Sequence, residues 1–91
     1  MYKITKADAT EIAFKKIGQL AFASGDQFEI LVNETREVNR GWVFFYNTAD
    51  YVRTRNPMHA LAGNGPILVL RNGQVLELPS AIPWEEALDR V

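Results

Sequence analysis

Residues 66–79, with the sequence PILVLRNGQVLELP, constrain the fold class more than any other stretch of the chain. Two runs of apolar residues flank Asn72-Gly73. This pair of residues readily adopts the positive φ angles of a type I′ turn. The stretch therefore predicts a β-hairpin that turns at Asn72-Gly73.

Two further strands are expected before the hairpin. In residues 27–33 (QFEILVN) apolar and polar side chains mostly alternate, which is typical of a strand with one buried face. Residues 41–47 (GWVFFYN) are apolar on both faces, so this strand is expected at the centre of a sheet with both faces covered. Between them, residues 34–40 (ETREVNR) indicate a charged turn or a frayed extension of a strand.

Helices are expected near both ends of the chain. Between positions 9 and 20 apolar residues recur at steps of three and four, which marks one face of a helix. Thr5 is suited to cap this helix, with Asp8 as its capping-box partner. Near the other end, Pro83 can open a helix over residues 83–91 (PWEEALDRV).

The predicted order is helix, two strands, an irregular segment over residues 48–65, two strands and helix. A short helix near residues 57–62, with Pro57 at its first turn and Gly63 closing it, fits inside the irregular segment. We therefore expect an α+β fold: a four-stranded, largely antiparallel sheet with the N-terminal and C-terminal helices packed on one face. The length suits a single domain that spans residues 1–91.

Composition and charge argue against several function classes. The 91 residues include no cysteine, which removes disulfides, thiolate metal sites and cysteine nucleophiles. The net charge is −1, whereas proteins that bind nucleic acid usually carry an excess of basic residues. No run approaches the roughly 20 apolar residues that a membrane span needs. We therefore expect a soluble, cytoplasmic protein that binds neither nucleic acid nor membrane.

No group of residues predicts catalysis, a metal or a cofactor. His59 is the only histidine, and no acidic residue stands three or four positions from it. Ser24 and Ser80 lack the context of a nucleophile elbow. Residues 63–66 (GNGP) precede a strand, whereas phosphate-binding loops open a helix, so a tight turn is favoured there. The sequence therefore indicates a protein that is not an enzyme.

The aromatic side chains of residues 41–47 allow two interpretations. Trp42, Phe44 and Tyr46 fall on one face of the expected strand. Stacked aromatics on a strand resemble an RNA-binding platform, but such a platform needs basic neighbours, and only Arg40 is close. Core packing is favoured, because so small a domain must bury its largest side chains.

Candidate partner-binding residues fall in two places. The irregular segment carries the first set, and tyrosine and arginine are frequent among the residues that dominate binding energy. A solvated connection explains this segment equally well. The last helix carries the second set, whose acidic side chains also suit a solvated helix N-terminus. The two sets are Tyr51, Arg53, Arg55 and His59 in the segment, and Glu85, Glu86 and Asp89 in the helix.

A series of short motifs runs through the chain from residue 41 onward. They are residues 41–47 (GWVFFYN), Tyr51, residues 61–69 (LAGNGPILV), Gly73, Leu78 and Pro83. In this order, over residues 38–90, they resemble the immunity protein 35 (YrhB-like) family of bacterial polymorphic toxin systems. The family often has an aspartate and a Thr-Gly turn after the proline-led strand. This chain has residues 70–73 (LRNG) there, which changes the charge of the turn and preserves the hairpin.

The resemblance implies a non-enzymatic immunity protein that binds and neutralises a cognate protein toxin. Some relatives are described as small, heat-stable, chaperone-like proteins, so shielding of apolar surface on client proteins is the alternative. An exposed edge strand would also permit a homodimer. The motif residues suit turns and the core, and we do not assign toxin contacts to them. They are Gly41, Trp42, Gly63, Asn64 and Pro66.

Overall fold

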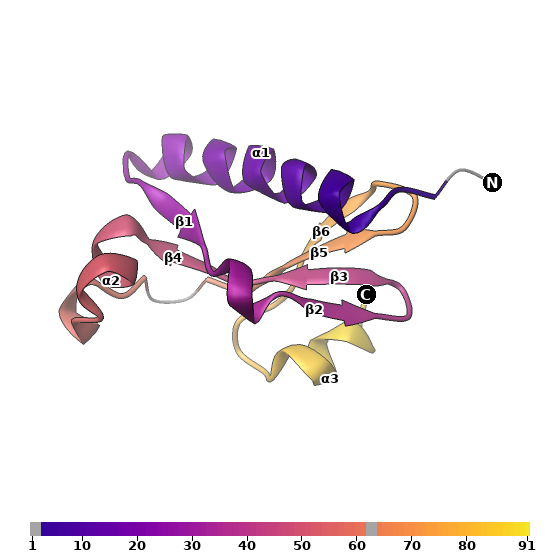
Figure 1. The fold of residues 1–91 in the computed structure, drawn as a ribbon. Coiled ribbons are helices and arrows are strands. Elements are labelled where there is room, and N and C mark those ends of the chain that lie inside the picture. Colours follow the sequence, from indigo (N-terminus) through magenta and orange to yellow (C-terminus); the bar gives the residue numbers. More distant parts are fainter. Residues whose placement is uncertain (1–2, 62–63) are drawn as a thin grey trace.

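The computed structural model describes residues 3–61 and 64–91, and these form helices above and below antiparallel strands (Figure 1). The elements, in chain order, are α1 (Lys6–Ser24), β1 (Phe28–Ile30), the 3₁₀ helix η1 (Val32–Glu34), β2 (Arg36–Val38), β3 (Gly41–Phe44), β4 (Tyr46–Thr48), α2 (Ala49–Thr54), the 3₁₀ helix η2 (Pro57–His59), β5 (Ile67–Leu70), β6 (Val75–Glu77) and α3 (Trp84–Leu88).

The strands form two antiparallel sheets. One has four strands in the order β2-β3-β5-β6, and the other pairs β1 with β4. The α+β class with a four-stranded antiparallel sheet is therefore confirmed. The strands that form this sheet differ from the expectation in one respect. One of its two edge strands is β2, which comes from the charged residues 34–40, whereas the strand expected over residues 27–33 contributes β1 to the smaller sheet.

The two sheets are halves of one bent hairpin. Residues 31–35 oppose residues 44–45, because Ile30 pairs with Tyr46 and Arg36 pairs with Val43. The surplus residues form η1, and the Leu31 N–H donates a hydrogen bond of 2.8 Å to the Phe45 carbonyl at the bend. Extra residues on one strand bend a ladder in this way. The single strand expected over residues 41–47 is therefore divided into β3 and β4 at Phe45.

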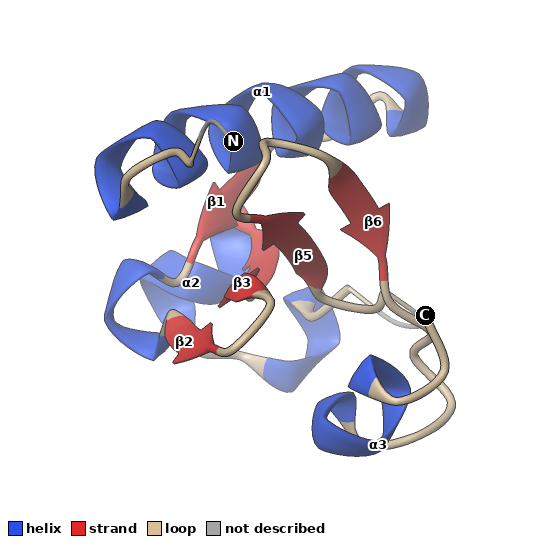
Figure 2. Ribbon diagram, turned by 90° about the vertical axis from the view of Figure 1, so that its right-hand side faces the viewer, coloured by secondary structure: helices blue, strands red, loops and turns tan. Residues whose placement is uncertain are grey.

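Helices α1 and α3 lie on opposite faces of the four-stranded sheet, so the expectation that both pack on one face is wrong (Figures 1 and 2). Side chains alternate between the faces of a strand. Trp42 and Phe44 face α1, whereas Val43 faces α3. Because β3 and β5 are apolar on both faces, each face needs its own cover. The aromatic side chains Trp42, Phe44 and Tyr46 are buried, as core packing predicts.

The expected start of α1 is confirmed. The Asp8 N–H donates to Thr5 Oγ1 and the Thr5 N–H donates to Asp8 Oδ2, both at 3.1 Å, which is a capping box. Gly25 ends the helix with φ +69°, a conformation that glycine adopts without steric cost. At the other end of the chain, Pro83 directly precedes α3.

The hairpin of residues 66–79 is present, but its turn is not type I′. The Gly73 N–H donates to the Leu70 carbonyl at 2.9 Å, and the Leu70 N–H donates to the Gln74 carbonyl at 2.8 Å. Gly73 has φ +91°, whereas Asn72 does not have a positive φ. This is the pattern of a three-residue loop with a glycine bulge, in which one residue with positive φ is sufficient.

Residues 48–65 contain more structure than the sequence indicated. They form α2, which was not expected, and η2, which covers only part of the helix expected near residues 57–62. Thr48 caps α2 by accepting a hydrogen bond from the Tyr51 N–H at 3.0 Å. No residue of α2 is fully buried, so the periodic apolar face that reveals longer helices is missing. Gly63, the expected end of the 57–62 helix, lies outside the described residues.

Candidate functional site

The first set of expected binding residues lies on α2 and η2, at one end of the molecule (Figure 1). The Arg55 guanidinium carbon lies 5.8 Å from the centroid of the half-buried Tyr51 ring, a cation–π contact. Arg53 is exposed and forms an ion pair of 2.8 Å with Asp50. His59 is exposed as well, and its backbone carbonyl accepts a hydrogen bond from Thr48 Oγ1 at 2.7 Å.

The second set lies on α3, well apart from α2 (Figure 1). Glu85, Glu86 and Asp89 are exposed, and Glu86 forms an ion pair of 3.4 Å with Arg90. Acidic side chains in the first turn of a helix interact favourably with its dipole. The structure therefore brings the members of each set together and keeps the two sets separate.

The segment after η2 is held to β4 by side chains instead of a strand ladder. Thr48 Oγ1 donates to the His59 carbonyl, Asn47 Oδ1 accepts from the Leu61 N–H at 2.7 Å, and Asn64 Nδ2 donates to the Tyr46 carbonyl at 3.0 Å. Each bond satisfies a backbone group that a neighbouring strand would otherwise satisfy. This attachment places Leu61 and Asn64 beside the aromatic end of β4.

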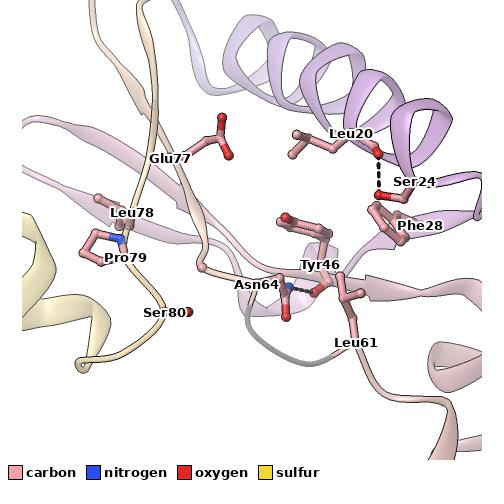
Figure 3. A pocket seen from close by; sticks show the side chains of 11 residues that line it. Leu20, Ser24, Phe28, Tyr46, Leu61, Asn64, Glu77, Leu78, Pro79 and Ser80 are labelled. Carbon is pink, nitrogen blue, oxygen red and sulfur yellow. Dashed lines mark hydrogen bonds between the residues drawn. The ribbon is translucent and has the colours of Figure 1, made fainter.

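A pocket of about 430 Å³ opens between α1, the end of β6 and this segment (Figure 3). Apolar and polar side chains from five parts of the chain contribute to its lining. The lining residues are Leu20, Ser24, Phe28, Tyr46, Leu61, Asn64, Gly65, Glu77, Leu78, Pro79 and Ser80. None of them belongs to the expected binding sets, so the sequence analysis missed this pocket.

Tyr46 and Glu77 supply the main polar chemistry of the pocket. Tyr46 is 8% exposed, and its ring lies 5.6 Å from that of Phe28, centroid to centroid. Burial raises the pKa of the Tyr46 hydroxyl, the Glu77 charge raises it further, and the Asn64 side chain partly offsets this. The hydroxyl is therefore neutral near pH 7. The Glu77 carboxylate lies 3.2 Å from Lys16 Nζ at the pocket's edge.

At two glycines of the motifs, the backbone approaches a neighbouring segment so closely that no side chain fits between them. A Cβ at Gly65 would overlap the Leu78 carbonyl oxygen, and a Cβ at Gly41 would overlap the Val69 carbonyl oxygen. Trp42 is buried in the core beneath the Arg71 guanidinium, whose carbon lies 4.7 Å from the ring centroid. These positions agree with the structural roles expected for the motif. Asn64, a polar residue in the otherwise apolar residues 61–69, was the signal in the sequence for the attachment to β4.

His59 does not line the pocket, and no group of three or more histidine, cysteine or acidic residues capable of holding a metal occurs in residues 3–61 and 64–91. No helix in the same ranges is long and apolar enough to cross a membrane.

The described residues form an α+β fold that presents a pocket and two surface helices with charged side chains. More particularly, the model of the immunity protein 35 family matches residues 7–91, so the chain belongs to the immunity protein 35 family. The resemblance found in the motifs is thereby confirmed, and the family name implies a role in a toxin system. No curated protein and no solved structure gives a significant match to the chain.

Proposed function

We propose that this chain is a non-enzymatic immunity protein that binds a cognate bacterial toxin in the cytoplasm and neutralises it within a polymorphic toxin system. The observation that carries the proposal is the match of residues 7–91 to the immunity protein 35 family. A specific interface takes roughly 800 Å² from each partner. The accessible surface of the described chain is 5917 Å², so a single face is large enough.

The surface of α2 and η2 is our first candidate for the toxin contact. It combines Tyr51, Arg53 and Arg55 with His59, and Met58 beside them is 89% exposed. An aromatic ring stacked with an arginine, next to an accessible apolar side chain, is typical of the residues that dominate interfaces. The arginines would also accelerate encounter with an acidic partner.

The acidic side chains of α3 form a separate, second candidate. Glu85, Glu86 and Asp89 lie on α3 and at its C-terminal end, apart from α2 in the fold (Figure 1). A homodimer through an edge strand is a further arrangement, with β2 as one edge of the four-stranded sheet. Light scattering after size-exclusion chromatography measures that state directly.

The proposal predicts a toxin gene beside this one, and the test uses the toxin domain that the neighbouring gene encodes, purified and immobilised. We expect the wild type to bind it and to restore growth of cells that express it. The variant that combines Tyr51→Ala, Arg53→Glu and Arg55→Glu should bind at least about tenfold more weakly, because it removes an anchor and reverses two charges. Arg36→Glu is the matched control, since Arg36 is an exposed arginine on β2. Equal binding by the triple variant and the wild type would exclude the α2 surface.

A chaperone-like activity is the second candidate function, and one observation favours it. Phe14 and Phe22 are 54% and 90% exposed, and Gly18 stands midway between them on α1. Residues four apart share one face of a helix, so the three positions form an apolar stripe. Exposed apolar surface of this kind can shield similar surface on an unfolded client.

This second candidate is tested without the toxin. Wild-type protein is added to heat-unfolded citrate synthase, and light scattering follows aggregation. If the stripe shields clients, the wild type suppresses aggregation and the double variant Phe14→Ser, Phe22→Ser does not. Undiminished aggregation in the presence of the wild type would rule the activity out while leaving toxin binding untouched.

A further inference from the structure

The pocket of about 430 Å³ is lined by polar groups together with a smaller apolar area. Leu20, Phe28 and Leu61 supply apolar surface, and the Tyr46 ring lies between them (Figure 3). Among the described residues of the lining, Glu77 is the only charged one. A ligand that fills the space would therefore need an apolar portion and would be favoured by a positive charge at one end.

Glu77 and the Tyr46 hydroxyl place a carboxylate and a hydroxyl at one end of the pocket. Figure 3 shows the Tyr46 hydroxyl on the side of the ring that faces Glu77. The hydroxyl can accept a hydrogen bond from a cation, and the Asn64 side chain lies beside the same ring, with its Nδ2 bonded to the Tyr46 carbonyl. Hydrogen bonds that involve charged groups are the strong ones, so this end suits a guanidinium or an ammonium group.

The chain's own lysine shows that the carboxylate accepts a cation. Lys16 Nζ lies 3.2 Å from Glu77 Oε2, and the two side chains are 30% and 58% exposed. Lys16 itself is not part of the pocket lining. An ion pair this exposed contributes little to stability, so a better-placed cation can replace or share it at low cost.

We propose that this pocket receives an arginine or lysine side chain of the partner protein, whose charged group binds Glu77 and Tyr46 while its aliphatic stem packs against Leu20 and Leu61. The proposal rests on the proposed toxin binding and identifies a contact outside α2 and α3. Long cationic side chains bury their stems against apolar surface and keep the charge at a polar rim, which is the arrangement that the pocket offers.

The decisive experiment compares two variants that break the same ion pair. Glu77→Gln removes the negative charge of the pocket, whereas Lys16→Met removes only the lysine. Binding of the neighbouring toxin domain is measured by calorimetry. We expect Glu77→Gln to weaken binding by about tenfold or more, and Lys16→Met to leave it unchanged or to strengthen it. Thermal unfolding of both variants shows that each is folded.

A second arm needs no toxin. Backbone amide resonances are recorded while Nα-acetyl-arginine amide is added, and the neutral isostere Nα-acetyl-citrulline amide serves as the control. The arginine probe should shift resonances of Leu61, Asn64 and Glu77 in the wild type, the citrulline probe should not, and Glu77→Gln should abolish the shifts.

The outcomes separate the inference from the proposed function. If the wild type does not bind the toxin, the proposed function is wrong and the inference falls with it. If the wild type binds and Glu77→Gln binds equally well, only the inference is wrong. Equal losses in Glu77→Gln and Lys16→Met would also overturn it, because they would show that the ion pair itself supports binding. Equal shifts by the two probes would overturn it independently.

Discussion

Asn64 Nδ2 donates a hydrogen bond of 3.0 Å to the backbone carbonyl of Tyr46, a residue eighteen positions earlier in the chain. The bond joins two family motifs, residues 41–47 and residues 61–69, at the wall of the pocket. It satisfies a carbonyl on the side of β4 that faces away from β1. The relationship explains why an amide side chain stands between two glycines in an otherwise apolar stretch.

Replacing Asn64 by leucine should destabilise the fold. The Tyr46 carbonyl would lose its partner in a partly buried place, which typically costs about 1–3 kcal/mol. Urea unfolding monitored by circular dichroism measures the change. Asn33→Leu is the control, because Asn33 is exposed on η1. Similar midpoints for Asn64→Leu and the wild type would show that the bond contributes nothing.

Two glycine-to-alanine substitutions should have opposite effects. At Gly65 the new Cβ would overlap the Leu78 carbonyl oxygen, so the backbone must move, and we expect a loss of about 2 kcal/mol or more. At Gly18 nothing lies within 4 Å of the Cβ position, and alanine is the better helix former by about 0.5–1 kcal/mol. Thermal unfolding compares the two variants with the wild type. A Gly65→Ala protein that melts with the wild type would contradict the close approach of the two backbones.

Tyr46 should ionise late in an alkaline titration. Burial and the Glu77 charge raise the pKa of its hydroxyl above the ordinary value of 10.0. A raised pKa in the folded state means that the folded protein holds the proton more tightly than the unfolded chain. The associated stability is complete below about pH 10 and is lost as the pH rises through the folded pKa.

Tyrosinate absorbance measures this titration. Tyr46→Phe should remove the latest-ionising component, and Glu77→Gln should shift that component to lower pH, because one of the two raising causes is gone. A late component that survives in Tyr46→Phe would assign the raised pKa to another tyrosine.

Arg71→Lys should not be a conservative change. The Arg71 guanidinium donates to the Val38 carbonyl at 2.8 Å and to Glu37 Oε2 at 3.1 Å, and it stacks on Trp42. Lysine cannot make this planar set of contacts, so we expect a loss of about 1–2 kcal/mol in urea unfolding. Arg53→Lys, which alters a single exposed ion pair, should stay within about 0.5 kcal/mol of the wild type. Equal stabilities for the two variants would refute the role of Arg71.

The elements that the sequence predicted well are those whose causes lie close together in the chain. Thr5 and Asp8 form their capping box three residues apart, and Gly25 closes the same helix. The apolar runs around Asn72-Gly73 pair as expected, although the turn differs, because Gly73 alone supplies the positive φ that a three-residue loop requires.

Helix α2 was missed because the sequence marks it only by polar residues near its ends and not by a periodic apolar face. Thr48 caps it, Asp50 stands in its first turn and Arg55 ends it in a left-handed conformation, but no buried stripe marks its face. The pocket was missed for a different reason. Tyr46, Asn64 and Glu77 come from separate parts of the sequence, and no local pattern indicates that they meet.

The amino-acid sequence alone determined the α+β class, the first helix with its cap, the hairpin of residues 66–79 and the resemblance to the immunity protein 35 family. These depend on contacts between residues a few positions apart and on motif spacing. Only the tertiary structure decided that α1 and α3 cover opposite faces, that Arg36–Val38 completes the sheet and that Tyr46 and Glu77 share a pocket. These features depend on contacts between residues far apart in the sequence. A strand that is apolar on both sides needs a separate element packed against each of its faces.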